Sequence, residues 1–190
     1  LSSRMLRDFR PPFGKVFLCP VAPDGIPYRC DEITHRWSGD LVDKVAAMKD
    51  FIIEFALYCG YDYLFLVDSD LVLHPRTLAR LQWTGRDIVS EVFWTKWQPN
   101  GVQLPQVWLK DPYDFTKFAP DERWDKMEAL RRATTFIESL RIPGTYEVGG
   151  LGACTLIKTG CLRSGLRFRK IENLAPRGED RHFCVRAVAM

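Results

Sequence analysis

Apolar and polar positions divide the chain into blocks whose periods predict helices and strands in turn. Residues 38–60 carry apolar side chains over much of a helical circumference, between a cap at Ser38 or Asp40 and a stop at Gly60, which predicts a largely buried helix. Residues 63–67 (YLFLV) form a continuous apolar run, as in a strand of a parallel sheet that helices cover on both faces. This order of elements indicates an α/β fold.

The alternation of predicted strands and helices continues on both sides of residues 38–67. Residues 15–22 and 86–94 have the composition of strands, and Pro75 is typical of the first turn of a helix over 74–82. The stretch 94–115 mixes aromatic residues with prolines and polar residues and has no simple period. It therefore predicts loops and short strands.

The last third of the chain returns to regular patterns. Residues 121–141 place apolar side chains at helical spacing opposite charged positions, which predicts an amphipathic helix. Residues 146–165 read as a glycine-rich turn, a short apolar strand and a helical turn, and residues 177–187 place acidic side chains at the start of a helix.

Composition sets limits on this picture. With 190 residues, 46% of them hydrophobic, the chain is long enough for one domain with a substantial core. The net charge of +3 comes from 27 basic and 24 acidic residues that are mixed along the chain, without the basic block that tracks a nucleic-acid backbone. No apolar run is long enough to cross a bilayer, and the N-terminus lacks an apolar signal core. We therefore expect a soluble protein that does not bind nucleic acid.

The cysteines and the chain ends suggest the setting of this domain. The six cysteines lack paired CxxC spacing and mostly have apolar neighbours, which predicts free thiols in a reducing compartment. We therefore expect a cytoplasmic protein. The sequence starts at Leu1 without an initiator methionine and stops at Met190 within a helical pattern. Residues 1–190 are accordingly expected to form a single domain of a longer chain.

Asp68 and Asp70 are the first candidate functional residues, and they directly follow the apolar strand. In open parallel sheets, ligands bind outside the carboxyl ends of strands. Two carboxylates this close repel each other unless a cation is present, and their hard oxygens suit Mg²⁺ or Mn²⁺ carried with a diphosphate. The alternative is a solvated turn, because Asp and Ser are common turn residues.

A second acidic pair, Glu179 and Asp180, stands where the last helix is predicted to begin. A carboxylate at this position could accept a proton from an attacking hydroxyl. The simpler interpretation is that the pair caps the helix, where the dipole favours negative charge.

The ordered set of these motifs resembles the GT-A-fold glycosyltransferases, especially their family 2-like members. The set consists of an apolar strand ending in DSD, then HPRTLARL, DIVSEVFW, VGGLGACTLI and GEDRHF, over about residues 40–190. The resemblance implies a Rossmann-like single domain with a mostly parallel central sheet flanked by helices.

The resemblance also implies an activity and roles for the acidic residues. Asp68 and Asp70 would hold the divalent metal, Mn²⁺ or Mg²⁺, and the nucleotide-sugar, whereas Asp180 or Glu179 would supply the catalytic base. The expected reaction is of the hexosyltransferase type, in which a nucleoside-diphosphate-sugar donates its sugar to a saccharide or other hydroxyl acceptor with inversion of configuration.

Further residues are candidates for contacts with the substrates, each with a structural alternative. Lys49 could reach a donor phosphate or snorkel from its helix, and Ser69 could contact the donor or only space the two aspartates. Donor contacts are also expected at three glycines that otherwise form a tight turn: Gly149, Gly150 and Gly152. Acceptor contacts are expected at residues that could instead be core, loop or helix-surface positions: Trp94, Trp97, Trp108 and His182.

Two other functions fit the same strand and acidic motif. In a haloacid-dehalogenase-like phosphatase, Asp68 would be the nucleophile and Asp70 the acid/base. That motif normally lies close to the start of its domain, and no later lysine and acidic pair stands out in the expected arrangement. A non-catalytic domain that binds a nucleotide or carbohydrate is the third possibility.

Overall fold

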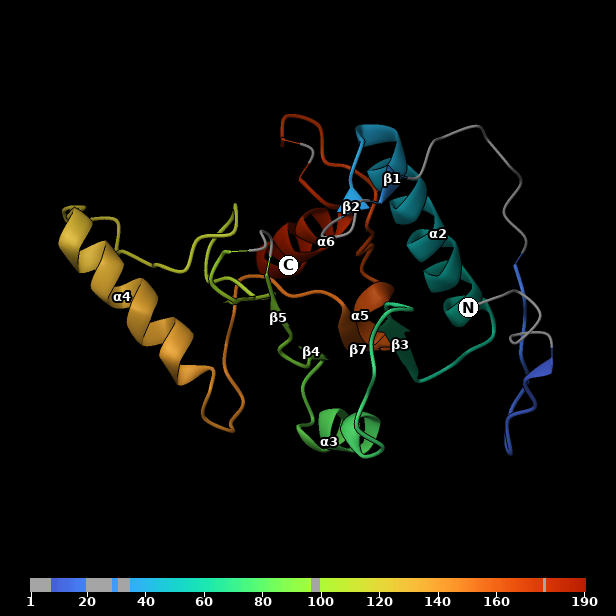
Figure 1. The fold of residues 1–190 in the computed structure, drawn as a ribbon. Coiled ribbons are helices and arrows are strands. Elements are labelled where there is room, and N and C mark those ends of the chain that lie inside the picture. Colours follow the sequence, from blue (N-terminus) through green and yellow to red (C-terminus); the bar gives the residue numbers. More distant parts are fainter. Residues whose placement is uncertain (1–7, 20–28, 31–34, 97–99, 176) are drawn as a thin grey trace.

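The computed structural model describes residues 8–19, 29–30, 35–96, 100–175 and 177–190. Helices and strands follow one another in mixed order (Figure 1). The elements are β1 (Arg29–Cys30), β2 (His35–Arg36), α2 (Gly39–Tyr58), β3 (Tyr63–Val67), α3 (Thr77–Trp83), β4 (Ile88–Ser90), β5 (Trp94–Thr95), β6 (Leu104–Pro105), α4 (Lys126–Ser139), β7 (Cys154–Lys158), α5 (Thr159–Leu162) and α6 (Glu179–Ala189). The mixed α/β class is confirmed.

The main sheet has three described strands in the order β3, β7, β4. β7 is antiparallel to both neighbours, and its central residue Leu156 pairs with Phe65 on one side and Val89 on the other. β3 and β4 therefore run in the same direction with a reversed strand between them. The other described pairs, β1 with β2 and β5 with β6, are also antiparallel. The mostly parallel sheet predicted from the sequence is not what these strands form, because an apolar run indicates burial but not the direction of its neighbour.

The core lies between this sheet and the helices α2, α5 and α6. Ile53 from α2, Ile157 from β7 and Phe183 from α6 are each at most 1% exposed and belong to one apolar cluster. Phe183 stacks on Phe168 with a centroid distance of 4.5 Å. This packing fixes the start of α6 relative to the middle of α2.

Helix α2 begins as predicted but is less buried than its composition suggests. The Ser38 hydroxyl accepts a hydrogen bond from the Leu41 amide at 3.2 Å, so Ser38 is the cap. One face is buried, but Phe51 on the opposite face is 57% exposed. Phe55 on that face contacts Phe17 edge to face at 5.8 Å. The prediction of a largely buried helix is therefore wrong for this outer face.

Several predicted boundaries shift in the structure. Residues 15–19 form no strand, and residues 20–22 of that predicted strand lie outside the described residues. The strand predicted over 86–94 is interrupted, since β4 ends at Ser90 and β5 starts at Trp94. The amphipathic helix is present as α4, but none of its residues is buried.

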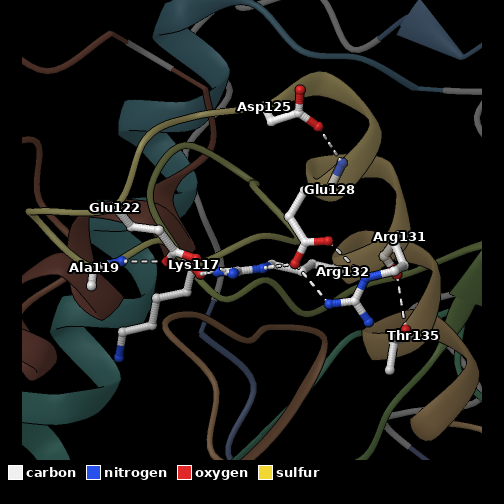
Figure 2. Close-up of polar contacts among 8 residues, drawn as sticks. All are labelled: Lys117, Ala119, Glu122, Asp125, Glu128, Arg131, Arg132 and Thr135. Atoms are coloured by element: carbon white, nitrogen blue, oxygen red, sulfur yellow. Dashed lines mark hydrogen bonds and ion pairs between the residues drawn. The ribbon is translucent and has the colours of Figure 1, made fainter.

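Helix α4 lies apart from α2 and α6 in Figure 1, and a charged network joins it to the preceding loop. Arg132 donates to Glu122 and, at 2.9 Å, to the Lys117 carbonyl, while Glu128 accepts from both Arg131 and Arg132 at 2.7 Å (Figure 2). The two arginines hold the pKa of Glu128 near 2. Such exposed pairs orient the loop more than they stabilise the fold.

Two further predictions from the sequence concern the state of the cysteines and the lack of a membrane-spanning run. Among the cysteines whose side chains are described, all are free thiols: Cys19, Cys59, Cys154, Cys161 and Cys184. Within the described part of the chain, no helix has both the length and the apolar character needed to span a bilayer.

Candidate functional site

A small pocket lies where β3 ends, β7 begins and α6 starts. Its cavity volume is only about 10 Å³, which is room for about one water molecule. Two of the predicted acidic residues and the predicted phosphate-binding lysine share this pocket with apolar side chains. The lining residues are Lys49, Leu66, Asp68, Leu151, Ala153, Thr155, Phe168, Asp180 and Phe183.

Asp68 is held at the rim of this pocket by the backbone of the sheet. Its amide donates to the Ala153 carbonyl at 2.9 Å, which extends the β3–β7 pairing by one residue. Its own carbonyl accepts from the Leu71 amide at 3.2 Å and closes a turn that contains Ser69 and Asp70. The motif is thus a turn whose backbone is fixed at Asp68. Asp68, Ser69 and Asp70 are all exposed, and of these three only Asp68 lines the pocket.

The electrostatics of Asp68 indicate an excess of negative charge around it. Partial removal of water by the surrounding protein raises the pKa of its carboxyl group, and Lys49 opposes this effect. The nearby charges of Asp70 and Glu179 raise the pKa further. A cation near Asp68 would relieve this repulsion.

Glu179 and Asp180 lie in the first turn of α6, behind Gly178. Their carboxylates bind the ammonium group of Lys49, which donates to Glu179 Oε1 at 2.7 Å and to Asp180 Oδ1 at 2.8 Å. Glu179 is buried, and the Asp180 side chain is 28% exposed. The acidic pair therefore engages a specific cation from another helix in addition to lying at a helix start.

Lys49 is the buried counter-ion of this acidic pair. Its side chain is 14% exposed, and its ammonium group lies 4.9 Å from the centre of the Phe168 ring. Burial alone would lower the pKa of Lys49, but the charges of Asp180 and Glu179 outweigh it and raise that pKa above its ordinary value. A role of Lys49 in binding a donor phosphate stays a prediction.

Asp180 keeps a raised affinity for its proton despite this ion pair. Burial raises its pKa to about 6, Lys49 works against the shift, and the like charges of Glu179 and Asp68 add to it. A carboxylate with such a pKa is mostly ionised at neutral pH yet basic enough to take up a proton.

The three glycines predicted to contact the donor differ in what they approach. A Cβ atom at Gly149 would collide with the Leu109 carbonyl, and one at Gly150 would collide with the indole of Trp108. A Cβ atom at Gly152 would lie 2.6 Å from Asp180 Oδ2. Gly149 and Gly150 therefore serve close packing within the chain, and Gly152 borders the candidate site.

Of the residues predicted to contact the acceptor, the three that the structure describes do not line the pocket. Trp108 is 5% exposed and belongs to the core, and Trp94 stacks against the guanidinium of Arg141 at 4.0 Å. His182 is 2% exposed and its Nδ1 accepts from the Ile171 amide, so its interpretation as a helix-surface histidine is wrong. Trp97 lies outside the described residues. Buried Trp108 and His182 have no surface to offer an acceptor in this structure.

The structure adds one aromatic residue that the sequence patterns did not single out. Tyr113 packs edge to face on Trp108 at 4.6 Å, and its hydroxyl donates to the Arg177 carbonyl just before α6. Burial and the negative charges of Asp180 and Glu179 raise its pKa to about 12. Its position in an irregular loop carried no periodic signal.

An ion pair ties the same loop to α6. The guanidinium of Arg181, which is 4% exposed, donates to both carboxylate oxygens of Asp111, at 2.5 and 2.7 Å. It also donates to the Ala175 carbonyl at 2.5 Å. This pair holds the first turn of α6, and with it Asp180, against the loop.

The carboxylate oxygens near Asp68 supply only part of the ligands that a divalent cation requires. Among the described residues, no three His, Cys, Asp or Glu side chains converge as a complete metal site. Asp68 and Asp70 nevertheless offer hard oxygens, and the charge of Asp70 acts on Asp68. Only Asp68 of the two lines the pocket, so a metal there would need most of its ligands from a diphosphate or water.

No protein-family model matches this chain, and no curated protein matches its sequence.

Proposed function

We propose that this protein is a metal-dependent glycosyltransferase that transfers a sugar from a nucleoside-diphosphate-sugar to an acceptor hydroxyl with inversion. One observation carries the proposal: Asp68 at the end of β3 and Asp180 at the start of α6 line the same pocket, although they are far apart in the sequence. A transfer site requires a group that binds the donor and a base that activates the acceptor, and Asp68 and Asp180 would supply these two functions at one pocket.

The GT-A-like fold belongs to the same proposal. It is supported by the mixed α/β architecture and by β3 and β4, which run in the same direction on either side of β7. The antiparallel pairing of β7 departs from the mostly parallel sheet that the family resemblance implies.

On the donor side, Asp68 and Asp70 would hold Mn²⁺ or Mg²⁺. The bound ion would neutralise charge on the departing diphosphate. The protein's own contribution is the backbone hydrogen bond from the Asp68 amide to the Ala153 carbonyl, which fixes the backbone position from which the carboxylate reaches the donor.

On the acceptor side, Asp180 would act as the general base. The acceptor hydroxyl loses its proton to the Asp180 carboxylate, its oxygen forms the new bond to the anomeric carbon, and the bond from that carbon to the diphosphate oxygen breaks. Attack from the face opposite the leaving group inverts the configuration. The pKa of about 6 supports Asp180 as this base. Glu179 is buried and serves less well.

The test is turnover of defined donors by the purified protein. The protein with MnCl₂ is incubated with UDP-glucose, UDP-N-acetylglucosamine and GDP-mannose, and nucleoside diphosphate release is measured. We expect release with at least one donor, and its loss in Asp68→Asn and Asp180→Asn. Absence of any metal-dependent release, with the wild type folded, would contradict the proposal for these donors.

The phosphatase alternative has one observation in its favour, namely that Lys49 and Asp68 line the same pocket. An ammonium group beside a carboxylate nucleophile suits a phosphate ester. However, Asp70, which would be the acid/base, does not line that pocket. Phosphate release from p-nitrophenyl phosphate that depends on Asp68, without cleavage of any nucleotide-sugar, would favour this alternative, and donor binding without cleavage would favour a binding domain.

A further inference from the structure

We propose that Lys49 and Gly152 are positioning residues for Asp180, which together make Oδ2 the oxygen that takes the acceptor's proton. The inference rests on the proposed function, because it assigns the base of that reaction to one oxygen atom. It is carried by the different surroundings of the two oxygens of the Asp180 carboxylate.

Lys49 engages Oδ1. Its ammonium group donates to Asp180 Oδ1 at 2.8 Å and to Glu179 Oε1 at 2.7 Å, so it bridges the two acids. The lysine comes from the middle of α2, whose neighbouring Asp50 accepts from the Phe168 amide at 2.6 Å. Because the ammonium is also only 4.9 Å from the Phe168 ring centre, it is held on several sides. An oxygen bound to this ammonium is the less basic oxygen of the carboxylate.

Gly152 leaves room for Oδ2. The backbone at residue 152 passes so close that an added Cβ would be 2.6 Å from Oδ2 and 3.2 Å from the carboxylate carbon. This segment is held against α6, because the Cys184 thiol accepts from the Leu151 amide and donates to the Leu151 carbonyl, both at 3.4 Å. The close approach is thus a property of the packed structure.

The two constraints act on the same torsions of one side chain. With Oδ1 held by Lys49, rotation of the carboxylate is restricted, and the missing Cβ at Gly152 leaves the room that Oδ2 itself occupies. The three atoms nearest to a methyl group at residue 152 all belong to the Asp180 side chain, so the carboxylate must give way against its bond to Lys49. We therefore expect it to turn the carboxylate while the backbone keeps its fold.

The first arm of the test compares two glycine substitutions. Gly152→Ala places a Cβ against Oδ2, whereas Gly160→Ala, the matched control, adds a Cβ with no atom within 4 Å and at an ordinary backbone conformation. We expect kcat of nucleoside diphosphate release to fall about 10²-fold in Gly152→Ala, with the donor KM changed less than about threefold, because misplacement of a reacting group by about 1 Å costs this much. Gly160→Ala should match the wild type. Equal kcat in both variants overturns the inference.

The second arm removes or replaces the cation. Lys49→Met removes the charge that lowers the pKa of Asp180, so the acidic limb of the kcat profile should move to higher pH, and Lys49→Arg should restore it in part. The groups that act electrostatically on or with Asp180 are Lys49, Glu179, Asp68, Tyr113 and Cys184. If Lys49→Met fails to fold, Lys49→Arg and Gly152→Ala still test whether Lys49 and Gly152 position Asp180. A profile of Lys49→Arg and Gly152→Ala identical to the wild type in kcat and pH dependence counts against the inference.

A third arm does not need activity. Crystal structures of the wild type, Gly152→Ala and Gly160→Ala should show the Asp180 carboxylate turned away from residue 152 only in Gly152→Ala. An unmoved carboxylate in Gly152→Ala would overturn the positioning role even if no donor of the panel were cleaved. Conversely, a turned carboxylate in a protein whose wild type cleaves no donor would reject the proposed function while leaving the role of Gly152 supported.

Discussion

The ammonium group of Lys49 lies 2.8 Å from Asp180 Oδ1, although 131 positions separate the two residues in the sequence. This contact joins α2 to the first turn of α6 beside a pocket that Asp68 also lines. Two carboxylates, those of Glu179 and Asp180, thus bind a single lysine, whose charge also acts on the third carboxylate, that of Asp68. The surplus of negative charge is what makes the pocket suited to a cation and to proton transfer.

The first prediction concerns the base. Asp180→Asn keeps the shape of the side chain but cannot accept a proton, so the rate of nucleoside diphosphate release should fall by about 10²- to 10⁴-fold. Steady-state kinetics with the donor that the wild type cleaves will measure this. Asp121→Asn, which changes an exposed aspartate before α4, is the control and should keep wild-type turnover. Normal transfer by Asp180→Asn would remove Asp180 from the mechanism.

The second prediction concerns the pH dependence of the rate. The pKa of Asp180 is raised to about 6, so the base is protonated and inactive below that pH. We expect kcat/KM, which reports the ionisation of the free enzyme, to rise as pH increases through about 6 and then to level off. Rates between pH 4.5 and 8 in buffers of constant ionic strength will test this, and a profile without an acidic limb would contradict the assignment.

The third prediction concerns the pH dependence of stability. Because the folded-state pKa of Asp180 is higher than the usual value of about 3.9, the folded state binds this proton more tightly than the unfolded state. Its contribution to the free energy of unfolding is therefore full at low pH and is lost as pH rises through about 6. In urea titrations at pH 4.5 and 7, Asp180→Asn should show a smaller loss between these values than the wild type. An identical loss in both would show that Asp180 titrates normally.

The fourth prediction concerns the divalent metal. Chelation with EDTA should abolish nucleoside diphosphate release, and added MnCl₂ should restore it. Asp68→Asn should need more Mn²⁺ for half-maximal rate than the wild type, because one of the two hard oxygen ligands is lost. Asp121→Asn again serves as the matched control. Release that continues undiminished in EDTA would exclude metal-dependent transfer.

The fifth prediction separates packing glycines from the site glycine. Gly150→Ala forces a methyl group into the indole of Trp108, and overpacking of this kind costs about 1–3 kcal/mol of unfolding free energy. Gly160→Ala has free space around its new Cβ and lies in helix α5, so it should raise the free energy of unfolding by about 0.4–1 kcal/mol. Urea denaturation followed by tryptophan fluorescence will measure both. Equal stability of the two variants would show that the contact with Trp108 is easily relieved.

The sequence allowed much of the local structure to be predicted, since local structure depends on neighbouring residues. The cap at Ser38 is confirmed, and the acidic pair does start a helix, because cap chemistry and helical period are encoded within a few residues. The extent of α2 burial was overestimated, because an apolar composition all round a helix does not reveal which face the rest of the chain covers.

The candidate site was predicted only in part. Asp68 and Asp180 were identified by their places at the ends of elements, and the structure brings them to one pocket. Trp108 is a core residue, which was the structural alternative to its acceptor role, whereas His182 was expected on the helix surface and is buried, because a helical pattern does not show which face the core covers. Tyr113 lies in an irregular segment, where no periodic signal marked it.

By itself, the sequence determined that helices and strands occur in mixed order, that Ser38 could cap a helix, and that carboxylates follow a strand and open a helix, because these features arise from backbone preferences over a few residues. Only the tertiary structure decided that β7 runs against its neighbours, that Gly152 rather than Gly149 or Gly150 borders Asp180, and that Lys49 binds the acidic pair. These contacts join residues far apart in the chain, and their geometry depends on how the whole core packs.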